Sequence, residues 1–429
     1  MKKGFLEYEE KKERALLVTV RLKNTFSKIP LDEEVKEFEE LVRSSGCEVV
    51  QSIVCKREAI DPKLYIGKGK ATQLAEICEE KDIDVVIFNN DLSFSQQINL
   101  EEIIGRKTID RTQLILDIFA QHAKTQEGKL QVELAQLEYL LPRLKGKGIL
   151  LSRLGGGIGT RGPGEKKLEI DRRRIEDRIQ KLKYEIQNVR NRRRILRIKR
   201  RKENIPLVSL VGYTNAGKST LLNSLTGASQ KTDSSMFTTL DPLSKRLVLP
   251  NNQKIILTDT VGFIKDLPKH LIEAFMATLE EIGEADLILH VLDISAPNVE
   301  EKYFSVQSVL KKLNFDKKPQ IVCLNKIDLL EDPLKVKMIE KKFQDPVLIS
   351  ALKRINLDKL LKKIEEFFEE KRGFYKVFIP HKSNNLLNEF YEKANVKKVE
   401  YTYEGIVCEL EADKIFMNKI LKKNEIKLL

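Results

Sequence analysis

The chain has 429 residues, of which 41% are hydrophobic and 33% are charged. This composition supports several folded cores and excludes wholesale disorder, and no run approaches the roughly 18 apolar residues of a membrane-spanning helix. The five cysteines are scattered, odd in number and form no CxxC pair, which excludes a disulfide framework or a structural zinc site. Such cysteine usage, together with a charged N-terminus that lacks the apolar core of a secretory signal, indicates a cytoplasmic protein.

Residues 1–118 predict an α/β domain in which strands and helices alternate. Helical spacing of apolar residues marks 35–42, and a capping-box sequence beginning at Ser93 predicts the start of a later helix. The expected strands are 15–20, 47–54 and 83–88. Alternation of this kind favours parallel pairing within one sheet.

Residues 119–204 predict an antiparallel helical hairpin. Apolar residues follow a heptad spacing in two stretches separated by a break, and two such seams are expected to pack against each other. The seams are Leu130, Leu134, Leu137, Leu141 and Leu144, then Leu168, Ile175, Ile179, Leu182, Ile186, Val189 and Leu196. The interval 145–164 holds eight of the 21 glycines and several basic residues, which predicts a functional loop; a disordered tip is the alternative.

Positive charge is concentrated in the second half of this hairpin. Lysine and arginine exceed aspartate and glutamate by 77 − 64 = 13 over the whole chain. The interval 161–204 alone holds 18 basic and 7 acidic residues, a difference of 11. Such a basic element indicates a nucleic-acid partner, and a solvated helix surface is the alternative.

Residues 205–371 predict a second α/β domain with a parallel-rich sheet, and residues 372–429 predict a small α/β domain. The expected strands of the larger domain are 207–211, 246–249, 254–258, 287–293, 320–324 and 347–349. The smaller domain has a βαββα pattern, with strands at 374–379, 396–401 and 406–410. The fold class is therefore a multidomain α/β protein with a helical hairpin between its first two α/β domains.

A phosphate-binding loop follows the strand 207–211. Its residues match G-x-x-x-x-G-K-[ST] without a mismatch, and a helical run beginning at Thr220 follows, as that motif requires. They are Gly212, Tyr213, Thr214, Asn215, Ala216, Gly217, Lys218 and Ser219. Backbone N–H groups of such a loop surround phosphate oxygens, while Lys218 reaches the β- and γ-phosphates and Ser219 binds Mg²⁺.

A DxxG motif, Asp259 to Gly262, directly follows the strand 254–258. A carboxylate at the end of a strand is the expected partner of Mg²⁺, and the Gly262 N–H is placed to sense the γ-phosphate. Between the two motifs lies a segment with Thr238 and Thr239. Thr239 is the expected residue that closes over Mg²⁺ in the triphosphate state, with Thr238 as the alternative.

Guanine specificity is predicted by NKID, which follows the strand 320–324. The Asp328 carboxylate accepts hydrogen bonds from guanine N1–H and the 2-amino group, which adenine does not offer. Lys326 lays its aliphatic stem over the base, and Asn325 completes the motif. After the strand 347–349, Ser350, Ala351 and Leu352 form a further loop from which the Ala351 N–H is expected to reach guanine O6.

These motifs and their flanks resemble the HflX family of translation-factor-like P-loop GTPases. The flanks that carry the resemblance are IDPKLYIGKGKATQL, LSFSQQINLE, DRTQLILDIFAQHAKTQEGKLQVELAQLEYLLPRL and GGGIGTRGPGEKKLEIDRRRI. The resemblance spans about residues 5–370 and implies a GTPase that binds the large (50S) ribosomal subunit, with the hairpin and its loop near the peptidyl-transferase region of 23S rRNA. Some members split stalled ribosomes. The candidate RNA contacts are Arg153, Arg161, Arg172, Arg173, Arg174, Arg192, Arg193 and Arg194.

Three further expectations concern hydrolysis and a second nucleotide. Phe263 stands where many relatives carry a water-orienting glutamine, so slow intrinsic turnover and stimulation by the subunit are expected. Asn215 resembles the residue that recruits K⁺ in some GTPases; a role in shaping the loop is the alternative. The run Gly67 to Lys70 raises ATP binding by the N-terminal domain, a use discussed for the family, but it lacks P-loop spacing and a simple turn is the better interpretation.

The expected function is GTP hydrolysis that controls binding to the 50S subunit, with splitting or rescue of stalled ribosomes. The expected cofactors are Mg²⁺ and, through Asn215, K⁺. The alternative is a GTP-dependent signalling switch that acts on a protein partner without the ribosome. The basic hairpin separates the two, because binding to RNA weakens steeply with salt through counterion release.

Overall fold

The computed structural model falls into two compact units that interleave along the sequence. The first comprises Met1–Arg192, Asp233–Asp241 and Val261–Leu279, and the second comprises Arg193–Thr232, Pro242–Thr260 and Glu280–Leu429. The structure describes residues 12–23, 30–154, 163–202, 205–227, 236–237, 241–265, 268, 271–272, 275–369, 372–383, 385–423 and 426–429. The segment 233–241, which lies between the phosphate-binding loop and DxxG, and the segment 261–279, which begins within DxxG, thus cluster with the N-terminal part of the chain.

The first unit contains a four-stranded parallel sheet of order β2-β1-β3-β4. Its strands are β1 (Arg14–Leu22), β2 (Glu48–Arg57), β3 (Val85–Phe88) and β4 (Lys107–Ile109). Its helices are α1 (Leu31–Ser44), α2 (Lys68–Glu80), α3 (Phe94–Ile104) and α4 (Arg111–His122). The predicted capping box is present, because Ser93 and Gln96 exchange side-chain and backbone hydrogen bonds at the start of α3.

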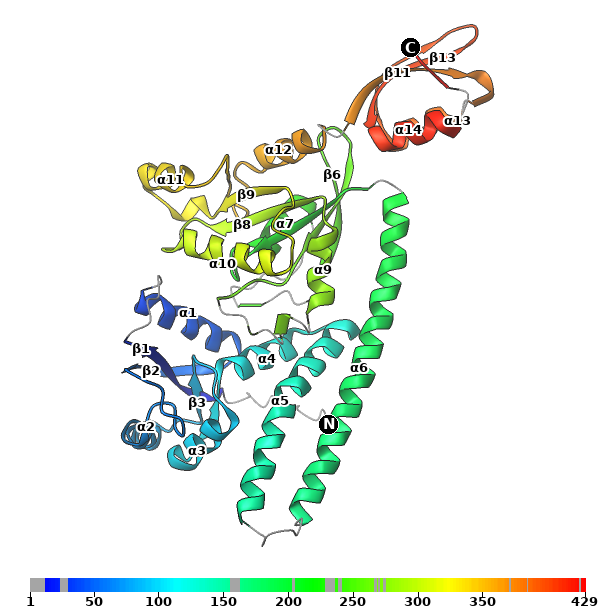
Figure 1. Ribbon diagram of the computed structural model, residues 1–429. Coiled ribbons are helices and arrows are strands. Elements are labelled where there is room, and N and C mark those ends of the chain that lie inside the picture. Colours follow the sequence, from blue (N-terminus) through cyan, green and yellow to red (C-terminus); the bar gives the residue numbers. More distant parts are fainter. Residues whose placement is uncertain are drawn as a thin grey trace, which may run out of the picture. The chain divides into compact units, whose positions relative to one another are not determined.

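Helices cover both faces of this sheet. Figure 1 shows α2 and α3 on one face and α1 and α4 on the other. Alternate residues of β1 and β3, such as Leu16, Val18 and Val86, pack against Leu74 of α2 and Leu100 of α3 in a continuous core. Burial on both faces explains why residues 15–18 of β1 and all four residues of β3 are apolar rather than alternating with polar residues.

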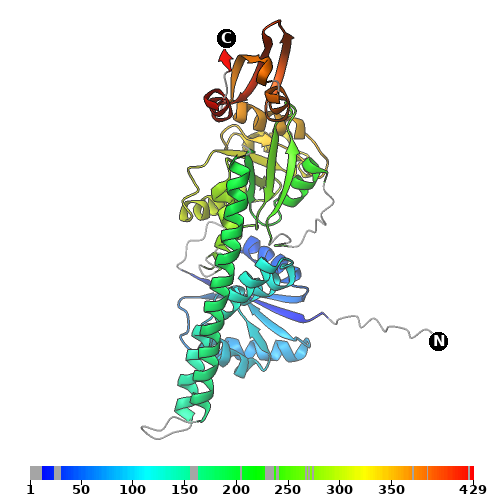
Figure 2. The same ribbon diagram turned by 90° about the vertical axis from the view of Figure 1, so that its right-hand side faces the viewer.

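The hairpin consists of α5 (Gln126–Leu154) and α6 (Pro163–Lys202). The two helices lie side by side in both views (Figures 1 and 2), and the seam between them buries Leu130, Leu134, Ile179, Leu182 and Ile186. The predicted heptad pairing is confirmed at these residues and at Leu137, Leu141 and Ile175, which pack against them, whereas the side chains of Leu168 and Leu196 lie outside the described part of the structure. The expected loop 145–164 is shorter than predicted, because α5 continues through 145–154, where an apolar stretch follows only two glycines. Residues 155–162 lie outside the described part of the chain.

A buried polar contact fixes the middle of α5 to the end of β4. Asp110 is fully buried and accepts hydrogen bonds from the Tyr139 hydroxyl at 2.8 Å and the Arg143 guanidinium at 2.9 Å. The Arg143 guanidinium also lies 3.4 Å from the centre of the Tyr139 ring. A buried carboxylate requires such partners, so this cluster ties the hairpin to the N-terminal sheet.

The second unit contains a six-stranded sheet of order β10-β9-β8-β5-β7-β6, in which only β6 is antiparallel. Its strands are β5 (Leu207–Gly212), β6 (Leu243–Val248), β7 (Lys254–Asp259), β8 (Leu287–Asp293), β9 (Gln320–Asn325) and β10 (Val347–Leu348). The elements between them are α7 (Lys218–Thr226), α9 (Met276–Glu284), α10 (Val299–Lys312), η1 (Ile327–Leu329) and α11 (Pro333–Glu340), with α12 (Leu357–Glu369) after β10. This confirms the predicted GTPase-type fold with a parallel-rich sheet.

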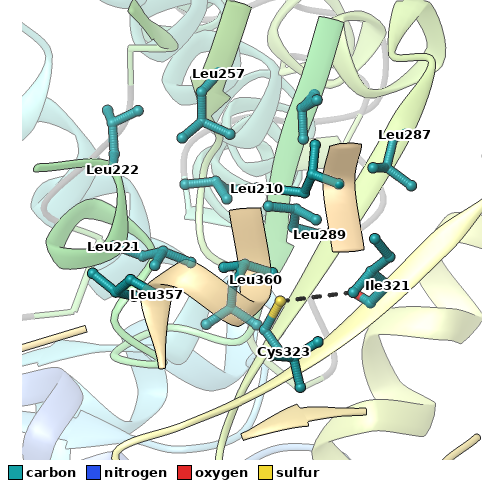
Figure 3. Close-up of a cluster of buried hydrophobic side chains, with 14 of the residues drawn as sticks. Leu210, Leu221, Leu222, Leu257, Leu287, Leu289, Ile321, Cys323, Leu357 and Leu360 are labelled. Atoms are coloured by element: carbon teal, nitrogen blue, oxygen red, sulfur yellow. Dashed lines mark hydrogen bonds between the residues drawn. The ribbon is translucent and has the colours of Figure 1, made fainter. Parts of the chain in front are cut away.

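Leucine side chains fill the core on one face of this sheet. Leu221 and Leu222 of α7 and Leu357 and Leu360 of α12 converge on strand residues such as Leu289 (Figure 3). All of them are buried. Because α7 starts at the phosphate-binding lysine, this packing holds the loop in front of it against the end of β5.

The C-terminal residues form an antiparallel sheet of order β12-β13-β11-β14. Its elements are β11 (Arg372–Pro380), η2 (His381–Ser383), α13 (Asn385–Lys393), β12 (Asn395–Tyr401), β13 (Gly405–Asp413), α14 (Lys414–Lys423) and β14 (Lys427–Leu428). The predicted βαββα order is present, and a short final strand extends it. All five cysteines are free thiols, and in the described residues no helix is long and apolar enough to cross a membrane.

Replacement of Leu182 by alanine should destabilise the hairpin, because its side chain is fully buried in the seam. We expect the free energy of unfolding to fall by about 2–5 kcal/mol, measured by denaturant titration of helical circular dichroism. Ile170→Ala is the matched control on the same helix, since Ile170 is 51% exposed. Equal losses of unfolding free energy in the two variants would contradict the packing of Leu182 between α5 and α6.

Candidate nucleotide-binding site

The nucleotide-binding groups of the second unit meet at one edge of its sheet. The parallel strands β5, β7, β8 and β9 all point their carboxyl ends in one direction. Gly212, Asp259, Asp293 and Asn325 are the last residues of these strands. Ligands of open α/β sheets bind outside the carboxyl ends of the strands, so the topology alone brings motifs far apart in sequence to one place.

Two glycines of the phosphate-binding loop are required by the space around them. A side chain at Gly212 would overlap the Val291 carbonyl of the neighbouring strand β8. Gly217 has a φ of +90° and faces the side-chain amide of Asn325, so any other residue there would be strained and would collide. Between them, Thr214 is buried, and in the part of the chain that the structure describes its hydroxyl has no hydrogen-bond partner.

Lys218 begins α7 and is buried beneath the loop. Its ammonium group donates to the carbonyl oxygens of Gly212 at 3.1 Å and Tyr213 at 3.0 Å, which curl the loop around it. Burial lowers the pKa of Lys218 to about 8, and the negative charge of Asp259 offsets part of this effect. An anionic phosphate beside this ammonium group would raise the pKa again, because it favours the charged form of the lysine.

Ser219 and Asp259 form a pair of oxygen ligands. The Ser219 hydroxyl donates to the Asp259 carboxylate at 2.6 Å. Hydroxyl and carboxylate oxygens are the ligands that Mg²⁺ prefers, and this ion needs few protein ligands when phosphates supply others. The residues therefore fit the predicted Mg²⁺ site. Thr239, the third predicted ligand, and its alternative Thr238 lie outside the described residues.

The Asn325 side chain connects three parts of the site. Its amide NH₂ donates to the Ala216 carbonyl of the phosphate-binding loop at 2.9 Å, and its amide oxygen accepts from the Ala351 N–H at 2.9 Å. This N–H was expected to reach guanine O6, but in the structure it is donated to Asn325. The Ala351 carbonyl in turn accepts from the Ser224 hydroxyl of α7 at 2.6 Å, a contact for which the sequence holds no signal.

Asp328, the predicted base-recognition residue, has a carboxylate oxygen that is buried and meets no hydrogen-bond partner among the described residues. This is the condition expected of a group that awaits a ligand. Its neighbour Lys326 has a φ of +67° and pairs its ammonium group with Asp293 at 2.8 Å. Asp293 was not among the predicted residues; a carboxylate at the end of the strand 287–293 is the signal that could have identified it.

The remaining predicted groups are Asn215 in the phosphate-binding loop and Gly262 with its neighbour Phe263 at the end of DxxG. Asn215 is exposed with a φ of +58°, a conformation that asparagine tolerates well, and this supports its role in shaping the loop. Gly262 and Phe263 belong to the first unit, and the Phe263 ring is buried. Because a phenyl ring has no hydrogen-bonding group, Phe263 cannot orient water.

The Gly67 to Lys70 turn has the geometry of an ordinary helix start. Gly67 adopts a φ of +80° and precedes α2, and the Lys70 ammonium donates to Gln73 one turn later at 2.9 Å. This geometry does not build a phosphate-binding loop. The structure thus favours the turn interpretation, which the sequence also favoured, over ATP binding.

Several candidate RNA contacts lie exposed on α6. Arg172, Arg173 and Arg174 each pair with an acidic residue three or four positions away on the same helix. Arg192 is exposed, whereas Arg193 is largely covered and lies 3.9 Å from Glu281. The side chains of Arg153, Arg161 and Arg194 lie outside the described part of the structure.

The affinity for GDP should fall as pH rises through the pKa of Lys218. Below about pH 8 the free protein already carries this proton, whereas above it binding must take up a proton because phosphate raises the lysine pKa. We expect affinity to fall by up to about tenfold per pH unit between roughly pH 8 and 9, measured by calorimetry. Lys218→Ala should give a flat profile, and an equally flat wild-type profile would contradict this account.

Asp328→Asn should exchange guanine for xanthine preference. The amide loses the acceptor that matches the guanine 2-amino group but gains a donor for the 2-oxo group of xanthine. We expect GDP affinity to fall by roughly 10- to 100-fold while xanthosine diphosphate binds better, as measured by competition. Asp332→Asn, at the N-cap of α11, is the matched control, since asparagine caps equally well. No change in the ratio of the two affinities would exclude Asp328 from base recognition.

Three family models match most of the chain. They are described as the N-terminal region of GTP-binding GTPases, matched over residues 32–120, their middle region, over 122–200, and a 50S ribosome-binding GTPase, over 207–326.

Curated relatives match over almost the full length. GTPase HflX of Caldanaerobacter subterraneus is 46% identical over 94% of this chain and 92% of its own, and GTPase HflX of Escherichia coli is 41% identical over 87% and 88%. Among solved structures, a GTP-binding protein from Sulfolobus solfataricus in complex with GDP is 29% identical over 82% of this chain and 98% of its own, with a TM-score of 0.44. The geometry of the site agrees with the identities to the two curated GTPases, and the chain belongs to the HflX family of GTPases and hydrolyses GTP.

Proposed function

We propose that this GTPase binds the large ribosomal subunit under the control of GTP and separates or rescues stalled ribosomes. The observation that carries the proposal is the exposed arginine surface of α6, Arg172 to Arg174, in a chain that also holds a guanine-nucleotide site. A family model described as a 50S ribosome-binding GTPase matches residues 207–326, which supports the same partner.

The chemistry of α6 suits 23S rRNA. RNA is bound mainly through phosphate, 2′-OH and shape contacts, and arginine presents a planar set of donors to phosphate oxygens. Arg173 and Arg174 are 73% and 77% exposed, and their acidic partners are also solvated. Such surface pairs are weak, so phosphate groups can replace the carboxylates at little cost.

The subunit is also the proposed activator of hydrolysis. Phe263 supplies no water-orienting group, and catalysis of phosphoryl transfer is largely positioning and charge stabilisation. We infer that the subunit orders Thr239 and the Gly262 segment, and that K⁺ beside Asn215 adds positive charge near the phosphates. When bound, Mg²⁺ neutralises phosphate charge, and Ser219 and Asp259 would hold it.

This role places the protein in the cytoplasm, in association with ribosomes. The second candidate is a signalling switch with a protein partner, which needs neither an arginine surface nor the ribosome. The two candidates differ in what stimulates turnover, and the following measurement separates them.

GTP turnover should rise strongly when purified 50S subunits are added and should be lost in Lys218→Ala. The triple replacement of Arg172, Arg173 and Arg174 by alanine should raise the half-saturating subunit concentration by roughly tenfold or more at physiological salt, because three phosphate contacts are lost. Exchange of K⁺ for Na⁺ should lower the stimulated rate.

A charge-matched control removes three exposed lysines from α11 and its end, Lys335, Lys337 and Lys341. It should leave the half-saturating concentration unchanged. Turnover that ignores the 50S subunit while GTP still binds would favour the signalling switch, and equal rates in K⁺ and Na⁺ would refute the role of K⁺.

A further inference from the structure

The carboxylate of Asp241, from the segment that follows the phosphate-binding helix, lies at the start of α5. It accepts hydrogen bonds from the backbone N–H of Lys124 at 3.1 Å and of Thr125 at 2.9 Å, and from the Thr125 hydroxyl. The same hydroxyl accepts from the Gly128 N–H at 3.0 Å. Asp241 therefore satisfies donors that the helix start leaves open, and its negative charge faces the positive end of the helix dipole.

Gly128 provides the space for this carboxylate. A Cβ atom at Gly128 would overlap an oxygen of Asp241. Gly128 lies in the first turn of a 29-residue helix, where glycine is otherwise an unfavourable choice. The space that a side chain at this position would fill is occupied by the carboxylate of Asp241, 113 positions later in the chain, and this explains the glycine.

A second contact holds the same segment and the segment after DxxG. The ring of Phe119, in α4, meets Phe237 edge-on with centroids 4.8 Å apart and Phe275 with centroids 4.7 Å apart. All three rings are buried. Phe237 adopts a φ of +59°, which is unusual for an aromatic residue and persists only where its surroundings hold it.

Two hydrogen bonds between backbone groups and side chains hold the same two segments. The Met236 N–H donates to the Ser44 hydroxyl at the end of α1 at 2.8 Å, and the Lys265 carbonyl accepts from Arg111 at 3.3 Å. Described residues of both segments, 233–241 and 261–279, thus contact α1, α4 or the start of α5. None of these contacts involves a nucleotide-binding residue.

We propose that Asp241 is a positioning residue that couples the bound nucleotide to the start of the hairpin. Asp241 follows two positions after Thr239, so a nucleotide that moves this stretch of chain also moves the carboxylate that caps α5. The contact between the Asp241 carboxylate and the start of α5 then has a formed state and a broken state, and the bound nucleotide shifts the equilibrium between them. By reciprocity, a change at the cap alters the relative affinities for GDP and GTP.

The amide protons of Lys124 and Thr125 report directly on this contact. Their hydrogen exchange is measured on the full chain, saturated with either GDP or a non-hydrolysable GTP analogue. We expect the two states to differ at least roughly fivefold in exchange rate at these amides, the lower range of known coupling between sites. No ribosome is needed, so this outcome is independent of the proposed function.

Gly128→Ala blocks the seat without removing the carboxylate, and Asp241→Ala removes the carboxylate itself. Gly69→Ala is the matched control, because Gly69 also lies in the first turn of a helix but has open space around it. In both test variants the two amides should exchange rapidly with either nucleotide, whereas the control should keep the wild-type difference.

The affinity for the two nucleotides provides a second readout. We compare the ratio of analogue affinity to GDP affinity in Asp241→Ala with the same ratio in wild type. The two should differ by the factor that separates the exchange rates of the Lys124 and Thr125 amides in the two nucleotide states of the wild type. Gly69→Ala should leave the affinity ratio unchanged. A purely structural cap predicts equal exchange in both states of the wild type and an unchanged affinity ratio. Either of these results, or a wild-type exchange difference that survives in the two test variants, overturns the proposal.

Discussion

The side-chain amide of Asn325 holds the nucleotide site together. It donates to the Ala216 carbonyl and accepts from the Ala351 N–H, so one planar group fixes the spacing between the phosphate-binding loop and the loop after β10. Gly217 permits this close approach because it has no side chain. The amide is buried, so the loss of either hydrogen bond would leave a buried polar atom without a partner. The two hydrogen bonds are therefore expected to form and break together.

The nucleotide site and the hairpin use positive charge in different ways. The nucleotide site buries the ammonium group of Lys218, and this burial lowers its pKa to about 8. The hairpin instead displays arginines in solvated pairs along α6. The first arrangement binds a small anion tightly within a fixed geometry, and the second suits an extended polyanion whose contacts are numerous and individually weak.

The sequence was informative where residue type and spacing are dictated by local chemistry. The phosphate-binding loop, DxxG and NKID lie at strand ends as predicted, and the heptad residues Leu182 and Ile186 are buried in the hairpin seam. It was less informative where a contact joins distant segments. The Ala351 N–H is donated to Asn325 rather than left for guanine, and α5 extends through 145–154 because helical continuity outweighs two glycines there.

The sequence by itself determined the chemistry of this protein: a guanine-nucleotide site, parallel-rich sheets and a basic heptad hairpin, because each depends on short-range spacing. Only the tertiary structure decided which groups pair across the chain. It joined Lys326 to Asp293, seated Asp241 on the start of α5, and placed Phe119 between Phe237 and Phe275. Such contacts depend on how packed elements bring remote residues within a few ångströms, which no local pattern encodes.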